Sequence, residues 1–291
     1  AIGQQYTSKV TEGDEIAMGH FGSLGYYLSA WVGKFAGKPE ESTEKIEIPE
    51  KYAFLRDTTL STALTMVVFY LIAAIAAGPD FVATLSGSMS PFLYAIMSAF
   101  NFAVGVTVVY AGVRMILGDL IPAFQGIATK IIPNAIPAVD CAVFFTYAPT
   151  AVVIGFISSF IGGIIGMLIL GALGGVLIIP GLVPHFFCGA TAGIFGNATG
   201  GRRGAMAGAF INGLAITFLP ALLLPVLGQL GFANTTFGDA DFGVLGILIG
   251  KAFTWFGEVG IYAIVAILAI ALIVPNFVKT KTAVINYTEE E

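Results

Sequence analysis

The amino-acid sequence predicts an all-α polytopic membrane protein, and three features of its composition carry that prediction. Of its 291 residues 57% are hydrophobic and only 11% are charged, whereas an average soluble domain is about 25% charged. Residues 141–201 contain no Asp, Glu, Lys or Arg, although one membrane helix needs only about 20 residues. Glycine, at 37 residues, is abundant, and small residues let membrane helices approach closely. A net charge of −5 leaves no basic face for nucleic acid.

The charged residues divide the N-terminal half of the chain into three segments. Residues 1–37 end in an apolar, Gly-rich stretch that is long enough for a tilted span or a membrane-inserted helix. Residues 38–57 carry ten of the 31 charged residues and are predicted to be a cytoplasmic linker, because Lys and Arg favour that side. Residues 58–114 hold two apolar spans, at 58–77 and 91–113, that fit a scaffold. Because the first residues include no Met and no basic leader, we expect the chain to be part of a longer protein.

The C-terminal half is predicted to contain interrupted helices. Pro122, Pro133 and Pro137 should break any straight helix in residues 115–140, which favours a hairpin or a discontinuous helix. Residues 115–257 are therefore predicted to be the core domain, and residues 258–291 the last span and a cytoplasmic tail. The expected elements of the core are spans at 146–166 and 167–183, a half-helix and loop at 185–201, a span at 204–227 and a short apolar piece at 242–257.

The sum is about six to seven transmembrane helices together with re-entrant or discontinuous segments. That mixture is typical of transporters that build a binding site from broken helices at the membrane midplane. The Gly162/Gly166 and Gly171/Gly175 pairs have the spacing of closely packed helices. Gly196–Gly201 lacks the Lys of a phosphate-binding P-loop, so a tight turn beside the following Arg pair is favoured over an anion or partner contact.

Asp140 is the strongest candidate for a substrate-binding residue. It lies at the edge of the long uncharged stretch, where a carboxylate is costly unless it faces a cavity or a partner. It either caps a helix at the membrane edge or accepts hydrogen bonds from substrate hydroxyls. Thr146 and Tyr147 follow closely and would add hydroxyl groups to the same site.

The two histidines, His20 and His185, both begin Gly-rich apolar segments and are further candidates for substrate contact. Each alternatively serves as a structural residue. Two histidines without a third ligand at short spacing do not predict a metal site, and we expect no cofactor. Cys141 and Cys188 lie in apolar surroundings and are interpreted as small buried hydrophobic residues. No set of catalytic residues is evident, so the chemistry predicted is the binding of a neutral or mildly anionic polar molecule.

Four segments give the chain a resemblance to the EIIC permease component of the bacterial L-ascorbate phosphotransferase system. They are Ile16–Ser23, Ala138–Pro149, Pro184–Arg203 and Gly231–Thr236, of which Pro184–Arg203 is the longest and most specific. The chain resembles the C-terminal part of that family over its whole length.

The resemblance implies a homodimer in the bacterial inner membrane, built from inverted repeats with a scaffold domain and a mobile core domain. The core would bind L-ascorbate and carry it across the lipid bilayer by an elevator motion. A phosphocysteine on the cytoplasmic EIIB partner, itself supplied by EIIA, would then phosphorylate it, so the chain is not an enzyme on its own. The substrate-contacting His and Asp of the family match His20 and Asp140. Phe21, next to His20, is a further candidate for substrate contact, at a position where the family can carry a polar side chain.

Two other functions remain open from the sequence. An ion-coupled transporter of a related polar anion would use Asp140 as a titrating group. A membrane assembly subunit without transport activity would leave substrate binding insensitive to His20 and Asp140, but broken helices at membrane depth are costly without a cavity.

Overall fold

A computed structural model describes residues 3–13, 16–47, 49–133, 135–229, 231–232 and 235–277. The helices are α1 (Gln4–Thr11), α2 (Ser23–Ala36), α3 (Thr58–Ala77), α4 (Pro79–Ser86), α5 (Pro91–Lys130), α6 (Cys141–Phe144), α7 (Pro149–Ala172), α8 (Leu182–Pro184), α9 (Ala190–Gln229) and α10 (Ala240–Phe277). Three 3₁₀ segments, η1 (Pro39–Glu41), η2 (Thr43–Lys45) and η3 (Glu50–Arg56), precede α3, and a π-helical turn, η4 (His185–Gly189), precedes α9. The strands are β1 (Ala17–Met18) and β2 (Ala138–Val139).

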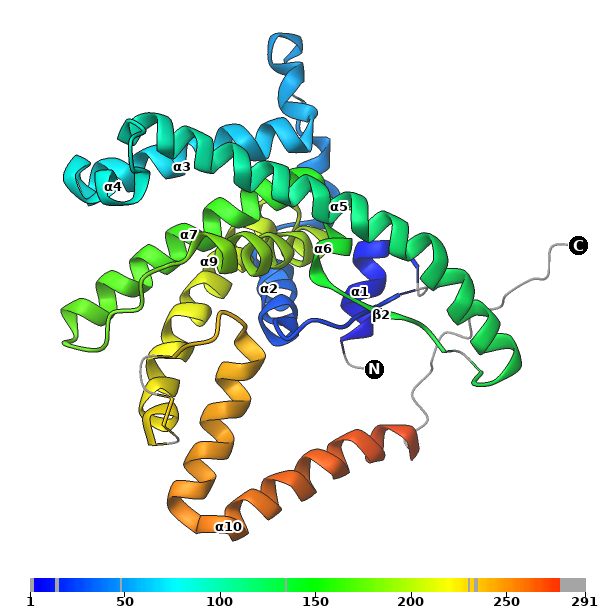
Figure 1. Ribbon diagram of the computed structural model, residues 1–291. Helices are drawn as coiled ribbons and strands as arrows, with labels where there is room; N and C mark the ends of the chain where they lie inside the picture. The colour runs from blue at the N-terminus through cyan, green and yellow to red at the C-terminus, as the bar shows by residue number, and fades with distance from the viewer. Residues whose placement is uncertain are drawn as a thin grey trace, which may run out of the picture.

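The centre of the molecule is a glycine bundle made of α2, α7, η4 and α9 (Figure 1). Glycine is required where these elements cross, because a Cβ on Gly155 of α7 would lie 2.7 Å from the Gly189 carbonyl oxygen and 2.8 Å from Gly193 Cα. Gly213 of α9 likewise meets the backbone of Ser159 in α7. At 14 residues α2 is only about 21 Å long, so it fits a membrane-inserted helix better than a complete span.

Two long helices bend at glycines with positive φ angles, as the sequence predicts for an interrupted core. In α9 the bend lies at Gly200 and Gly201, where Gly201 has a φ of 58°. Because a Cβ on Gly196 would touch the Gly204 carbonyl, the two parts of α9 fold back on each other, which confirms a half-helix, a tight turn and a longer span. α10 bends at Gly257, which has a φ of 60°, close to the predicted break between residues 242–257 and 258–291.

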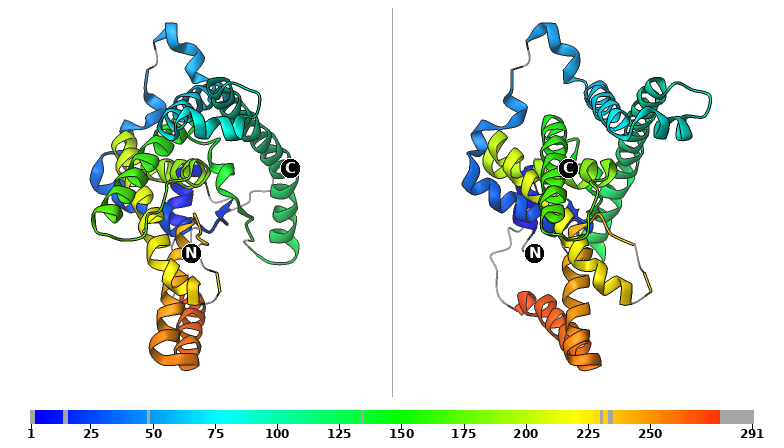
Figure 2. Two further views of the ribbon diagram at one scale, coloured as in Figure 1. Left: turned by 60° about the vertical axis from the view of Figure 1, so that its left-hand side comes forward. Right: turned by 90° about the vertical axis from the view of Figure 1, so that its left-hand side faces the viewer.

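The apolar helices α3, α5 and α10 lie outside the glycine bundle. Figure 1 shows α3 and α5 crossing above it. The first part of α10 packs on α9 at Gly243, Gly246 and Gly250, and in both views of Figure 2 α10 lies at the end of the molecule opposite α3. Within the described residues five helices are long and apolar enough to cross a membrane: α3, α5, α7, the segment Leu182–Gly228 and α10. The chain is therefore a multi-pass, all-α membrane protein.

Three boundaries differ from the sequence prediction. The helix predicted to end near residue 113 continues through Arg114 and Pro122 to Lys130, because one proline removes only one backbone hydrogen bond. The predicted span at 146–166 corresponds to α7, whereas most of the predicted span at 167–183 is the non-helical apolar segment that follows α7. The described residues therefore hold five helices long enough to cross a membrane instead of the six to seven spans expected, and two of them, α9 and α10, are bent. The Gly162/Gly166 pair packs against α9 as predicted, but the Gly171/Gly175 pair meets only leucines of its own segment.

The charged segment 38–57 is attached to the glycine bundle. The Asn197 side chain accepts from the Thr43 backbone N–H at 2.8 Å, and the Glu44 carboxylate accepts from the Thr150 and Ala151 N–H groups at 3.2 and 3.0 Å. Gly201, next to the Arg pair, packs on the Glu41 carbonyl. This contact agrees with placing the charged segment and the Arg pair on one side of the membrane. The division into five segments stays a prediction, and the tail with Lys279 and Lys281 lies outside the described residues.

Candidate functional site

A two-residue parallel β pair brings His20 and Asp140 together. Ala17 pairs with Ala138 and Met18 with Val139, so the residues that leave β1 and β2 emerge side by side. His20 follows β1 by two residues and Asp140 follows β2 directly, which places His20 Nε2 3.8 Å from Asp140 Oδ1. The two residues chosen from the sequence, although 120 positions apart, therefore share one site.

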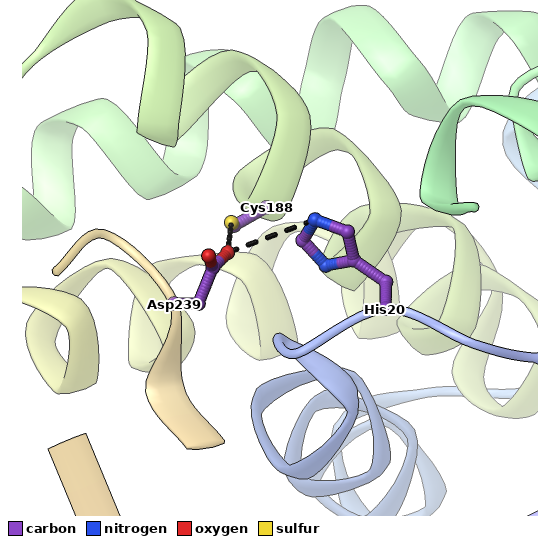
Figure 3. A group of neighbouring side chains, drawn as sticks. All are labelled: His20, Cys188 and Asp239. Atoms are coloured by element: carbon purple, nitrogen blue, oxygen red, sulfur yellow. Dashed lines mark hydrogen bonds and ion pairs between the residues drawn. The ribbon is translucent and has the colours of Figure 1, made fainter. Parts of the chain in front are cut away.

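A second carboxylate reaches the same histidine from the segment before α10. Asp241 fixes this segment to the start of α2, because its N–H donates to the Phe21 carbonyl at 3.0 Å and its carboxylate accepts from the Leu24 N–H at 2.8 Å. Asp239 Oδ1 then lies 3.7 Å from His20 Nε2 and accepts a hydrogen bond from Cys188 Sγ at 3.1 Å. Figure 3 shows that His20, Cys188 and Asp239 come from three separate segments and point toward one another.

The protonation of His20 is determined by the hydrogen bonds of its Nδ1 atom. The Gly22 backbone N–H donates a hydrogen bond to Nδ1 at 3.1 Å, and a backbone N–H can act only as a donor. Nδ1 is therefore an acceptor, and the hydroxyl of the fully buried Tyr26 donates to it as well, at 2.7 Å. The neutral ring must then carry its proton on Nε2. The site presents one N–H donor with a carboxylate on each side.

These groups line a pocket of about 360 Å³. Its lining is His20, Asp140, Cys141, Val183, Pro184, Phe187, Cys188, Gly238 and Asp239. No Lys or Arg belongs to this lining within the described residues. The N–H donor of His20 lies between the acceptor carboxylates of Asp140 and Asp239, and apolar side chains form the rest of the lining. The pocket therefore suits a small molecule rich in hydroxyl groups.

The same side chains have spacings that a metal ion could use. The ligand atoms of His20, Cys188 and Asp239 lie within 4.8 Å of one another, as do those of His20, Asp140 and Cys141. A metal ion would bind the lone pair of Nε2, which is free only when the ring proton is on Nδ1. A proton on Nδ1 would face the Gly22 N–H, and the hydrogen bond between them would be lost. The hydrogen bonding of His20 therefore does not fit a metal ligand.

The other four predicted contact residues do not line this pocket. Phe21 is 60% exposed and stacks on Phe242 at 4.7 Å between ring centroids. Thr146 and Tyr147 are exposed beyond α6, and Thr146 Oγ1 donates to the Val143 carbonyl at 2.9 Å. Substrate contact by these three residues stays a prediction.

His185 is placed inside the glycine bundle. It is 2% exposed, and its Nδ1 lies 2.9 Å from Ser159 Oγ of α7. A Cβ on Gly163 would overlap its ring, so the imidazole fills a space that glycine leaves open. This placement matches the structural alternative, and substrate contact by His185 stays a prediction.

Asp239, Cys188 and Cys141 are pocket residues that the sequence reasoning did not select. Both cysteines are buried, as predicted, with 3% and 1% exposure, but both also line the pocket. Asp239 had a usable signal, because it stands immediately before a long apolar helix, as Asp140 stands before the uncharged stretch.

Comparisons with known proteins identify the family to which the chain belongs. The family model for EIIC-GAT, the sugar-specific permease component of the PTS system, matches residues 1–241. The chain is 27% identical over 228 residues to the ascorbate-specific PTS system EIIC component of Mycoplasma pneumoniae. That match covers 69% of this chain and 34% of the relative, so the chain spans about a third of the relative's length. The chain belongs to the EIIC-GAT family of PTS sugar-specific permease components.

Proposed function

We propose that this chain forms part of a permease that binds L-ascorbate in the His20 pocket and moves it across the membrane as it is phosphorylated. The observation that carries the proposal is the placement of His20 Nε2 between Asp140 and Asp239 in a pocket of about 360 Å³. L-ascorbate offers several hydroxyl groups that two carboxylates accept and oxygen atoms to which Nε2 donates. The name of the Mycoplasma pneumoniae relative supports ascorbate as the substrate.

The phosphoryl group would come from a phosphocysteine of an EIIB partner, which EIIA recharges. The buried Cys141 and Cys188 belong to the pocket wall and are not assigned this role. An elevator motion of a core domain against a scaffold is the proposed route of transport. The close packing of α2, α7, η4 and α9 on one another, and of α3 on α5, supports that division.

A homodimer in the bacterial inner membrane is the proposed assembly. Only 6% of the most apolar window of α10 is buried, which leaves its surface to lipid or to a second copy. Cross-linking in native membranes distinguishes the two, because a second copy gives a discrete dimer.

An ion-coupled transporter of a polar anion is the second candidate. The two carboxylates beside His20 favour it, since a proton or another cation could neutralise one of them as an anion enters. Without such a cation, an anionic substrate faces two like charges.

Transport by the complete permease in proteoliposomes separates the two candidates. We expect L-ascorbate uptake to require phosphorylated EIIB and to yield the phosphorylated product without an ion gradient. Uptake that needs an ion gradient but no phosphorylated EIIB would contradict the proposal and support the second candidate.

A further inference from the structure

Asp239 is the charged group of the pocket to which neither the family match nor the resemblance assigns a role. We propose that Asp239 is a second substrate-binding carboxylate, positioned by Cys188, and that it forms with Asp140 and His20 a site for a vicinal diol. This inference rests on the proposed function, because it identifies which part of L-ascorbate the pocket contacts. The matching part is the diol of the side chain rather than the ionised ring.

The distances around His20 leave both carboxylates available to a ligand. Nε2 lies 3.8 Å from Asp140 Oδ1 and 3.7 Å from Asp239 Oδ1, whereas an N–H···O hydrogen bond is about 2.7–3.2 Å long. Neither carboxylate is therefore hydrogen-bonded to the ring. Two adjacent hydroxyl groups can donate one hydrogen bond to each carboxylate while one of their oxygen atoms accepts from Nε2.

Cys188 restricts the orientation of Asp239. Its thiol is 3% exposed and donates to Asp239 Oδ1 at 3.1 Å, whereas the Asp239 side chain is 28% exposed. A buried donor on one oxygen holds the carboxylate in a single orientation toward the pocket (Figure 3). Cys188 is thus a positioning residue for Asp239.

The charge of the pocket separates the two ends of L-ascorbate. With two carboxylates and no Lys or Arg in the described lining, the pocket repels a delocalised negative charge. Uncharged hydroxyl donors experience no such repulsion and hydrogen-bond strongly to a carboxylate. The diol end therefore enters the pocket and the ionised ring stays at its mouth.

The test is calorimetric titration of the complete permease with three probes: L-ascorbate and its 5-deoxy and 6-deoxy analogues. In Asp239→Ala we expect L-ascorbate to bind about tenfold more weakly, the usual effect of losing a buried charged hydrogen-bond partner. For one of the two deoxy analogues the same substitution should have almost no effect, since the hydroxyl that Asp239 binds is already missing. Asp140→Ala should likewise leave the affinity for the other analogue almost unchanged, since that analogue lacks the hydroxyl that Asp140 binds.

Three further variants test the specificity of this effect and the role of Cys188. Asp80→Asn removes an exposed carboxylate of α4 that lies outside the pocket lining, and it should change affinity less than twofold. Cys188→Ala should weaken L-ascorbate binding a few-fold, and Cys188→Ser should restore it because a hydroxyl also donates.

The outcomes are distinct. Failure of the unchanged permease to bind L-ascorbate would overturn the proposed function together with this inference. Normal L-ascorbate binding by Asp239→Ala, or an equal loss for all three probes, would overturn the inference alone and leave the proposed function standing.

Discussion

The glycine bundle and helix α5 are both rich in glycine, but their glycines have opposite surroundings. In the bundle, a Cβ on Gly155 would lie within 2.8 Å of two backbone atoms of neighbouring segments. In α5, a Cβ on Gly105 or Gly112 would meet nothing within 4 Å among the described residues. Glycine thus serves two purposes: close backbone contact around the site, and an uncrowded surface on an outer helix.

The two regions do not differ in how completely their buried polar groups are paired. The bundle pairs Ser159 with His185, and Tyr26 of α2 lies beside His20. The amide of the buried Asn212 in α9, however, has no hydrogen-bond partner within the described part of the chain, and neither has the buried Tyr110 hydroxyl in α5. The contrast between the regions therefore lies in how closely their backbones approach neighbouring segments.

Substitutions of glycine by alanine should show the largest contrast between the regions. Gly155→Ala is expected to destabilise the protein by about 1–3 kcal/mol, because the new methyl group would overlap backbone atoms that cannot move aside. Thermal unfolding in a mild detergent measures the effect.

Gly112→Ala in α5 is the matched control. It should leave the melting temperature unchanged or raise it, since alanine is favoured over glycine in a helix by up to about 1 kcal/mol. Equal destabilisation by both substitutions would contradict the contrast.

The helix caps of α7 in the bundle and of the outer helix α3 should give the next largest difference in stability. Glu44 accepts hydrogen bonds from the first turn of α7 across 106 residues of chain, whereas Asp57 caps α3 locally through the Leu60 N–H at 2.8 Å. Glu44→Ala should cost about 1–2 kcal/mol, because it loses a cap and releases the linker from the bundle.

Asp57→Ala should cost only about 0.5–1 kcal/mol, the ordinary effect of a lost cap. Limited proteolysis of the linker adds a second readout, and faster cleavage is expected only in Glu44→Ala. A larger stability loss in Asp57→Ala would reverse the assignment.

Two tyrosines provide the smallest test. Tyr26→Phe removes the hydroxyl that donates to His20 Nδ1, and we expect a loss of about 1 kcal/mol in both stability and L-ascorbate affinity. Tyr110→Phe removes an unpaired buried hydroxyl and should be neutral or slightly stabilising.

Melting curves and calorimetric titration of both variants check this pair. A ligand affinity that stays unchanged in Tyr26→Phe would show that the hydroxyl does not support the site through His20.

The sequence predicted those parts of the fold that follow from local composition. The structure contains the apolar helices predicted for the uncharged stretch after Asp140. It also contains the turn at Gly200 and Gly201 and the break near Gly257. Pro122 was misleading, because α5 tolerates the loss of one hydrogen bond and continues. Residues 167–183 were misleading because hydropathy does not distinguish a helix from the non-helical apolar segment that follows α7.

The site was only half predictable for a similar reason. His20 and Asp140 were selected because each is a lone polar group beside an apolar segment. Their pairing depends on β1 and β2, which have two residues each and leave no periodic pattern. Asp239 enters through the docking of the α10 segment on α2 and there meets Cys188 of η4, and nothing in the local sequence encodes either contact.

The central claim is that His20 and Asp140 bind the substrate in one pocket, and calorimetric titration of L-ascorbate into the purified permease tests it directly. We predict that His20→Ala and Asp140→Ala each weaken binding by at least about 1–3 kcal/mol, the cost of leaving a bound polar group of the substrate without its hydrogen-bond partner, while the melting temperature is preserved. Affinities equal to that of the unchanged protein in both variants would contradict the account.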